Sequence, residues 1–484
     1  MAPMTNDGDG RLAAPPELAS PRATVTMFVF NDMAHDARVR KEAMSLAAAG
    51  YAVTLIGRQR EREPLPAREQ VNGFTLLRIP VPRTGRALLA GARRPWRLRR
   101  RLLGSFRAAL GRPPRGWLKA VGMVVASPAV ATWAAYRAAD VYLLGDRAPS
   151  PGRGGPIDWL TRWQLDIKGW GELAAAAAPS SDVWHGHDFT GLPAAFAAQR
   201  RHGGKVVYDS HEIFMETTHI SRMPAWTRWR LIREERDWTR RADALIAVSE
   251  GSRAELAKRY EPRRSLWVTN CPPRWGGSDG RDRLREALGL PSETPIVLYH
   301  GGFMEGRGIE QLAAAMLQPE MAGVHAVYLG YGQLRPRIEA WTRDPSYGGR
   351  VHLLEAVPIE ELLSWVTTAD VGLSVFQPET LNYRLTLSNK LFETIAAGVP
   401  VIASDFAQNR HVLLDDAEAP LGAVIDPDDP AALAREVRAV IDLPPAERRA
   451  ARERRMRAAR ERWNWESESQ KLLDLYADLT APGH

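Results

Sequence analysis

The sequence predicts an α/β protein with two Rossmann-like, doubly wound domains that face each other across a cleft. The chain has 484 residues, more than one hydrophobic core usually organises, so two domains of roughly 200 residues each are expected. Uncharged β-branched runs alternate with segments of helical spacing, and this alternation starts twice, near residues 24 and 296. No solenoid-length repeat or heptad run competes with this pattern.

Composition points to a globular protein of a reducing compartment. The only cysteine is Cys271, which excludes an internal disulfide and a cysteine-based zinc cluster. Residues 1–22 lack an apolar leader and are expected to form a disordered tail, so we expect a cytoplasmic protein.

The first domain opens with a βαβ unit. Residues 24–30 are uncharged and rich in β-branched and aromatic side chains, as in a strand buried on both faces. Residues 38–49 have helical spacing and end at Gly50, and residues 51–56 return as a strand. Such a unit is the minimal half of a Rossmann fold, and it places Asp36 and Arg38 at the start of its helix.

A basic insert follows at residues 83–136. Its first part, 83–119, carries twelve basic residues and no acidic one, and without these charges the formal net charge falls from +8 to −4. The rest of the protein therefore has no nucleic-acid-binding character, whereas 83–119 suits an anionic membrane surface such as the inner face of the cell membrane. The alternative is an arginine-rich helix packed on its own domain. A membrane span over 120–136 is disfavoured by its length and by Pro128.

Polar side chains follow two later strands of the first domain. His187 and Asp188 end one short strand, and His211 and Glu212 follow the strand at 205–208. Ligands of open α/β sheets bind at the carboxyl ends of the strands, so these residues are candidates for the cleft. The alternative is that each histidine satisfies only a local hydrogen bond.

The second domain starts after a linker. Pro272 and Pro273, followed by the glycine-rich residues 276–280, mark the domain boundary. A buried strand at 296–302 then runs into a loop with Gly301 and Gly302, and Arg307 precedes the helix at 309–316.

Residues 388–404 combine a polar cluster, a helix, a turn and a strand. Ser388 is a candidate N-cap, and Lys390 and Glu393 lie on one face of the first helical turn. A helix N-terminus with a lysine binds an anion, and a carboxylate one turn on accepts hydrogen bonds from ribose hydroxyls. The alternative is an ordinary surface helix, in which this pattern is common.

These segments resemble the retaining glycosyltransferases of the GT4 type. The resemblance is carried by the helix at 388–396 with its Gly398-Val399-Pro400-Val401-Ile402 turn, by the opening of the first domain, and by the glycine loop. It covers nearly the whole chain outside the first 22 residues and the insert, and it implies the GT-B architecture. The expected divisions are a tail at 1–22, an acceptor-side domain at 23–272, a donor-binding domain at 273–460, and a C-terminal helix at 461–484. In the family such a helix crosses back to the first domain; the alternative is that it caps the second.

The resemblance also implies roles for single residues. His187 and Asp188 would be catalytic, and Asp36, Arg38, His211 and Glu212 would lie on the acceptor side. The residues expected at the nucleotide-sugar donor are Gly301, Gly302, Gly332, Arg307, Ser388, Asn389, Lys390 and Glu393.

The sequence departs from the family pattern at three places. Met33 and Ala34 stand where many members carry a Gly-Gly pair, Gly302 stands where an arginine is usual, and Leu385 replaces a glutamate on the sugar side. Glu379 is near enough in sequence to substitute for that glutamate.

The expected activity is transfer of a sugar from a nucleoside-diphosphate donor to a hydroxyl of a saccharide or lipid-linked acceptor, without a metal or other cofactor. Two alternatives remain: a nucleotide-sugar 2-epimerase of the same fold, and a degenerate subunit that binds the sugar nucleotide without catalysis.

Overall fold

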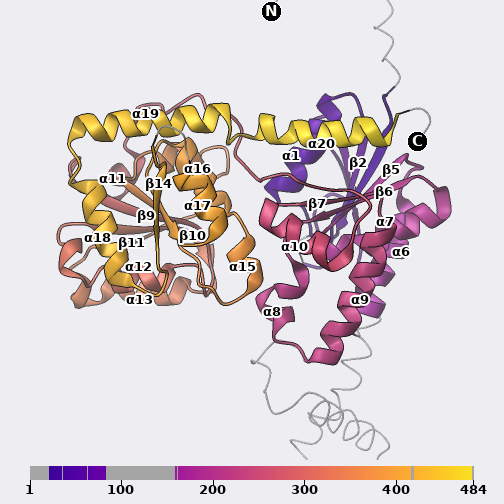
Figure 1. Cartoon of the computed structure of the whole chain (residues 1–484), viewed down its shortest axis with the longest axis horizontal. Helices are drawn as coiled ribbons and strands as arrows, with labels where there is room; N and C mark the ends of the chain where they lie inside the picture. Colours follow the sequence, from indigo (N-terminus) through magenta and orange to yellow (C-terminus); the bar gives the residue numbers. More distant parts are fainter. Residues whose placement is uncertain are drawn as a thin grey trace, which may run out of the picture.

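The computed structural model describes residues 21–34, 36–62, 64–82, 159–160, 162–415 and 419–481. The insert at 83–136 and almost all of the tail at 1–22 lie outside these residues, so the expectations for both stay predictions. Within the described part, two parallel sheets lie side by side with helices on both faces of each (Figure 1).

The first sheet has eight strands in the order β3-β4-β2-β1-β5-β6-β7-β8. All of its pairings are parallel except that between β3 and β4. The strands are β1 (Thr24–Phe28), β2 (Ala52–Arg58), β3 (Arg68–Val71), β4 (Phe74–Ile79), β5 (Val183–His187), β6 (Lys205–Ser210), β7 (Ala244–Ala247) and β8 (Ser265–Trp267).

Successive side chains of β1 enter the hydrophobic cores on opposite faces of this sheet. Phe28 packs with α6 (Lys168–Ala177), α7 (Asp188–His202) and α9 (Ala225–Arg241). Val25 and Met27 pack with α1 (Ala37–Ala48) and α20 (Trp465–Leu479). The helices of this half are α1 (Ala37–Ala48), α6 (Lys168–Ala177), α7 (Asp188–His202), α8 (Thr218–Ser221), α9 (Ala225–Arg241) and α10 (Glu250–Tyr260), with a π-helical turn at Trp163–Ile167 and a 3-10 turn at Phe214–Glu216.

The second sheet has six strands in the order β11-β10-β9-β12-β13-β14, all parallel. They are β9 (Ile296–Phe303), β10 (His325–Gly332), β11 (Val351–Glu355), β12 (Val371–Ser374), β13 (Val401–Ser404) and β14 (Gly422–Ile425). The helices are α11 (Arg283–Leu288), α12 (Ile309–Ala315), α13 (Arg335–Arg343), α14 (Leu362–Val366), α15 (Leu381–Leu385), α16 (Asn389–Ala396), α17 (Ala407–Leu414), α18 (Pro430–Ile441) and α19 (Pro445–Glu461), with 3-10 turns at Pro319–Met321 and Pro345–Tyr347.

The last helix, α20 (Trp465–Leu479), lies on the first half of the molecule (Figure 1). Its residues Trp465, Leu472 and Tyr476 belong to the core that covers α1 and β1, and the Trp465 Nε1 donates a hydrogen bond of 2.9 Å to Ser45 Oγ. The predicted boundary at 272/273 falls between the two sheets.

Three details of the first half go beyond the expectations from sequence. β3 and β4 form an antiparallel hairpin, β8 is limited to Ser265–Trp267, and α7 begins at Asp188, directly after β5. Among the described residues, no helix is both long enough and apolar enough to span a membrane.

Candidate active site

A cavity of about 670 Å³ lies between the two halves, at the carboxyl ends of both sheets. The residues that line it include Asn31, Asp32, Asp36, Arg38, His211, Glu212 and Asn270 from the first half, and His300, Gly301, Gly302, Arg307, Gly330, Tyr331, Val357, Ile359, Phe376, Asn382, Tyr383, Ser388, Asn389, Lys390 and Glu393 from the second.

Eleven predicted site residues thus line one cavity. They are Asp36, Arg38, His211, Glu212, Gly301, Gly302, Arg307, Ser388, Asn389, Lys390 and Glu393. The other three, His187, Asp188 and Gly332, are not among the lining residues. A Cβ on Gly332 would lie 2.4 Å from Phe303 O, so this glycine serves the close pairing of β9 and β10.

The second half contributes two basic side chains to the cavity, the buried Lys390 and the partly buried Arg307. Lys390 Nζ lies 4.8 Å from the centre of the Tyr299 ring, and the Arg307 guanidinium lies 5.7 Å from the Phe376 ring. Neither has a carboxylate partner among the described residues. Burial, together with the charge of Arg307, lowers the pKa of Lys390 to about 7. Two basic side chains at one wall, neither in an ion pair with a described residue, favour an anionic ligand.

The local sequence explains how these cations are placed. Ser388 caps α16, because its hydroxyl accepts a hydrogen bond from Leu391 N, so Lys390 falls in the first turn. Arg307 lies between Gly306 and Gly308, which have φ values of 74° and 82°. A Cβ on Gly308 would lie 2.6 Å from Val375 O, so glycine is needed for the loop to approach the residue that follows β12.

Glu393 is held by a histidine that sequence reasoning missed. His300 Nε2 lies 2.9 Å from Glu393 Oε2, and the His300 side chain is buried within β9. The available signal was its position, directly before Gly301 and Gly302. The contact fixes the orientation of the carboxylate that lines the cavity.

The opening loop of the first half keeps a glycine-like backbone. Met33, which stands in place of a glycine of the family pattern, has φ 63° and a buried side chain. Asp36 caps α1 by accepting from Val39 N, and its other oxygen accepts from Asn31 Nδ2 at 2.7 Å. The departure at Met33 therefore leaves the turn in place while filling its interior.

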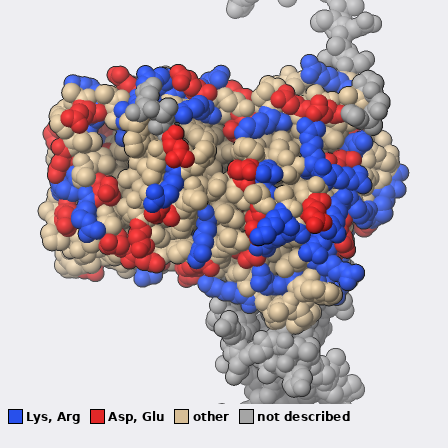
Figure 2. All heavy atoms as spheres, viewed as in Figure 1, with Lys and Arg blue, Asp and Glu red and all other residues tan. Residues whose placement is uncertain are grey.

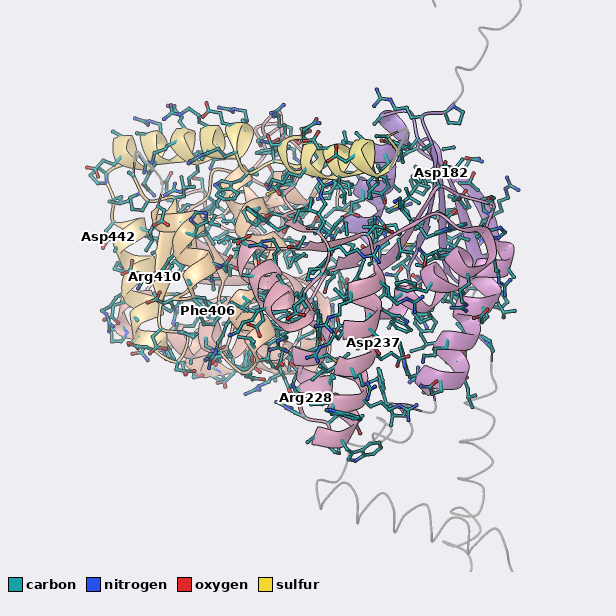
Figure 3. The ribbon with its side chains drawn as sticks, turned by 45° about the vertical axis from the view of Figure 1, so that its right-hand side comes forward. Asp182, Arg228, Asp237, Phe406, Arg410 and Asp442 are labelled. Atoms are coloured by element: carbon teal, nitrogen blue, oxygen red, sulfur yellow. The ribbon has the colours of Figure 1, made fainter. Side chains whose placement is uncertain are left out.

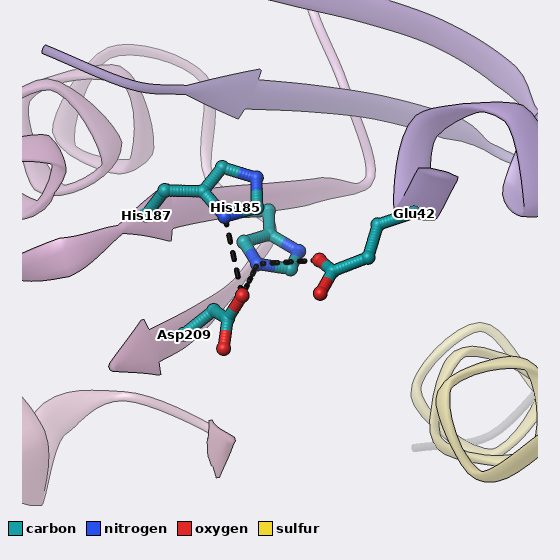
Figure 4. A group of neighbouring side chains, drawn as sticks. All are labelled: Glu42, His185, His187 and Asp209. Carbon is teal, nitrogen blue, oxygen red and sulfur yellow. Dashed lines mark hydrogen bonds and ion pairs between the residues drawn. The ribbon is translucent and has the colours of Figure 1, made fainter. Parts of the chain in front are cut away.

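A cluster of buried ionisable side chains lies next to the part of the cavity wall that the first half forms. It consists of Arg38, Glu42, His185, His187 and Asp209, and Figure 4 shows the last four. Arg38 donates to both oxygens of Asp209, at 3.1 and 2.9 Å, and its Nε lies 3.0 Å from Glu42 Oε1. His187 Nδ1 is 3.2 Å from Asp209 Oδ2, and His185 Nδ1 is hydrogen-bonded to the Tyr476 hydroxyl of α20 at 2.7 Å.

Burial decides the protonation of this cluster. It raises the pKa of Glu42 to about 8, with a further contribution from Asp209, and it lowers the pKa values of His185 and His187. Burial opposes ionisation of Asp209 too, but Arg38 holds the pKa of that carboxyl well below its usual range. At neutral pH the cluster is therefore centred on one Arg38–Asp209 ion pair, with neutral imidazoles beside it.

His211 connects the cluster to the cavity. Its Nε2 lies 3.0 Å from Asp209 Oδ2 and its Nδ1 lies 3.5 Å from Asp188 Oδ2. Burial disfavours a charged imidazole, but Asp188 and Asp209 outweigh it and raise the pKa of His211 to about 10. The cationic histidine at the cavity wall is thus His211. His187 is fully buried, and both His187 and Asp188 contact His211, so their expected catalytic role stays a prediction.

Glu42, His185, His187 and Asp209 are the group of described residues that could share a metal ion, since one ligand atom from each lies within 4.8 Å of the others. Arg38 contacts both carboxylates, however, and its fixed positive charge already neutralises Asp209. The donor set therefore fits an arginine-centred ion pair better than a divalent cation.

The structure shows the contacts of Leu385, which replaces the sugar-side glutamate of the family pattern, and of Glu379, its candidate substitute. The carbonyl of Leu385 accepts a hydrogen bond of 2.6 Å from Ser249 Oγ, so this residue joins the two halves. Glu379 lies 3.5 Å from Arg222, also across the halves, and is not among the residues that line the cavity. Glu212 does line it, and its carboxyl interacts electrostatically with Arg307 of the second half.

Solved structures with the same architecture cover nearly the whole chain. A sucrose-phosphate synthase from Thermosynechococcus elongatus is 18% identical, with a TM-score of 0.65 over 94% of this chain and 98% of that one. HepE of Anabaena, solved with UDP and glucose, is 13% identical, with a TM-score of 0.58 over 94% and 100%. These similarities establish the GT-B fold, in which two Rossmann-like domains enclose a cleft.

Family models and curated relatives agree with this class. The model of group 1 glycosyl transferases matches residues 294–442, and that of glycosyltransferase family 4 matches residues 129–271, so together they cover more than half of the chain. The chain belongs to the group 1, family 4 glycosyltransferases. D-inositol 3-phosphate glycosyltransferases from Xylanimonas cellulosilytica and Streptomyces avermitilis are 30% and 27% identical, each over 49% of this chain. The chain spans 58% and 52% of the length of these two relatives.

Proposed function

We propose that the protein transfers a sugar from a nucleoside-diphosphate donor to a hydroxyl group of a saccharide or lipid-linked acceptor. The observation that carries the proposal is the pair of basic side chains Lys390 and Arg307, which form no ion pair within the described part of the chain and line the cavity together with a glycine loop. A leaving diphosphate needs positive charge already in place, because its charge develops as the sugar–oxygen bond breaks.

The remaining donor contacts follow from the same wall. The N-terminal turn of α16 adds backbone N–H groups and the positive end of the helix dipole. Glu393, oriented by His300, accepts hydrogen bonds from the ribose hydroxyls. This donor site requires no metal, because Lys390, Arg307 and the helix dipole supply the positive charge.

The acceptor binds against the wall formed by Asp36, His211 and Glu212. Cationic His211 adds positive charge opposite Arg307 and Lys390, so the developing diphosphate is attracted from both sides of the cavity. The curated relatives are named for a hydroxylated acceptor, which supports this chemistry. Retention of the anomeric configuration, a cytoplasmic location and contact of 83–119 with an anionic membrane are parts of the same proposal.

The test combines donors with variants. Purified protein is incubated with common nucleotide-sugars and with monosaccharide or lipid-linked acceptors, and nucleoside diphosphate release and the product's anomeric configuration are measured. Arg307→Ala and Lys390→Ala should each lower turnover by at least about tenfold with little change in Tm. Arg343→Ala and Lys258→Ala remove exposed cations elsewhere and should leave turnover unchanged. Full turnover in both site variants would overturn the assignment, and an epimerised donor without acceptor product would identify a 2-epimerase.

A further inference from the structure

We propose that the outward face of α9 is a docking surface for anionic lipid headgroups at a membrane surface. The helix lies at the edge of the first half, and its first turns, near Arg228, reach the rim of the molecule (Figures 1 and 3). Its inward face is fixed by Thr227, Leu231, Glu235 and Thr239, all buried. The opposite face is therefore presented to the surroundings in a fixed orientation.

Two tryptophans on this outward face are exposed. Trp226 is 39% exposed and Trp229 is 63% exposed, the largest value among the exposed large hydrophobic side chains of the described residues. They lie three residues apart, so they stand side by side on the helix. Tryptophan combines a large apolar ring with a polar N–H group, and it is enriched at the boundary between lipid headgroups and acyl chains.

Arginines continue the same face. Arg230, Arg233 and Arg236 are exposed and form no ion pair with any described residue. The guanidinium of Arg233 lies 5.8 Å from the ring of Trp229, which places cation and aromatic ring in one patch. Figure 2 shows lysine and arginine side chains gathered over this part of the surface. Such a patch suits phosphate groups, which accept from guanidinium in pairs.

The acidic residues of α9 do not neutralise this patch. Glu234 turns inward to accept from Trp163 Nε1 at 2.9 Å, and Glu235 is buried between the hydroxyls of Tyr208 and Tyr260. Asp237 is exposed but lies further from the tryptophans along the helix. Arg228 and Arg240 of α9 form ion pairs with Glu216 and Glu261, whereas Arg230, Arg233 and Arg236 keep their charge available.

Charge complementarity favours lipid over cover by the chain's own insert. The segment at 83–119 carries twelve basic residues and no acidic one, so it repels Arg230, Arg233 and Arg236. A membrane with anionic lipid attracts both. Each arginine near such a surface strengthens binding, and two interfacial tryptophans add apolar area.

If the protein is a transferase, as proposed above, the α9 face could hold a lipid-linked acceptor for the cavity. His211 and Glu212 line the cavity, and the chain runs from them through the turn at Phe214–Glu216 and α8 directly into α9. A lipid-linked acceptor held at the α9 face would therefore be bound on the same half of the molecule as the acceptor wall.

The test is co-sedimentation of the full chain with vesicles of phosphatidylcholine alone or mixed with phosphatidylglycerol. Wild type should bind the mixed vesicles, and binding should weaken with salt. W226A/W229A and R230Q/R233Q/R236Q should each weaken binding by at least about tenfold. R448Q/R449Q/R457Q removes three exposed charges from α19 and serves as the matched control, which should bind like wild type. Unchanged Tm values verify folding.

Three outcomes would overturn the proposal. Wild-type binding by both α9 variants, with loss only when 83–119 is deleted, would assign the contact to the insert alone. Equal binding to neutral vesicles would remove the role of the arginines. Tight binding of a labelled RNA that both α9 variants abolish, without vesicle binding, would make the patch a nucleic-acid surface. None of these readouts requires sugar transfer, so failure of the transferase proposal would leave the membrane proposal standing.

Discussion

At the scale of single residues, the protonation of Lys390 controls how the cavity receives a phosphate. Its pKa is about 7 in the free protein because burial and Arg307 disfavour the ammonium form. A diphosphate stabilises that form, so binding takes up a proton above pH 7. Nucleoside diphosphate affinity should therefore fall between pH 7.5 and 9, by up to about tenfold per pH unit. Calorimetry in buffers of different ionisation enthalpy measures both the affinity and the proton uptake.

Lys390→Gln and Lys390→Arg are the controls for this prediction. Neither side chain titrates in the window, so affinity should be lower for glutamine and nearly flat with pH for both. A wild-type slope in the glutamine variant would show that another group takes up the proton.

The orientation of Glu393 leads to a prediction about the preference for ribose over deoxyribose. Because His300 fixes one of its oxygens at 2.9 Å, the carboxylate is oriented before the ligand arrives. Wild type should bind a ribonucleoside diphosphate at least about tenfold more tightly than its deoxyribose counterpart. Glu393→Ala should lose this discrimination, as measured by thermal shift and calorimetry with the diphosphate that binds.

Glu436→Ala on α18 is the control, and it should keep the wild-type preference. If Glu393→Ala also kept the preference, ribose recognition would have to be assigned to another side chain.

At the scale of elements, the loop between β9 and α12 is expected to be intolerant of any side chain at Gly308. A Cβ there would lie 2.6 Å from Val375 O, and φ is 82°. Gly308→Ala should cost roughly 1–3 kcal/mol of unfolding free energy and weaken nucleotide binding, because the loop moves and takes Arg307 with it. Urea unfolding and calorimetry measure the two effects.

Gly289→Ala separates backbone strain from the clash. Gly289 also has a left-handed φ of 64°, but a Cβ there meets nothing within 4 Å. It should cost about 1–2 kcal/mol without changing nucleotide affinity. Equal losses of affinity in both variants would argue against a specific role of the Gly308 loop.

Helices and strands could be predicted from sequence better than the positions of individual site residues. The uncharged strands and the Ser388 cap could be predicted because burial and capping leave local signals. The position of the His187 side chain could not be predicted. β5 lies between β1 and β6 in the sheet, and all five of its residues are buried, so both of its histidines are buried as well. The pairing of His300 with Glu393 was equally hidden, because 93 residues separate them in the chain. Polar residues at strand ends predict a cleft, but only the packed structure shows which ones reach it.

At the scale of the whole molecule, α20 ties the two halves together. In sequence it follows the second sheet, yet Leu472 and Leu475 are fully buried in the core formed with α1 and β1, and Tyr476 is hydrogen-bonded to His185 of the charge cluster. Leu472→Ala should therefore lower the unfolding free energy by about 2–5 kcal/mol. Hydrogen exchange should show the loss of protection in β1 and β2, whereas β9 and β10, which α20 does not cover, should be little affected.

Leu433→Ala on α18 is the mirror control, since Leu433 is buried in the core of the second sheet. It should reduce protection in β9 and β10 and leave β1 and β2 nearly unchanged. If Leu472→Ala instead reduced protection equally in both sheets, the two halves would unfold as one cooperative unit. In that case α20 would couple the stabilities of the two halves. Loss of a contact in the first core would then also destabilise the second half, which carries Lys390 and Arg307.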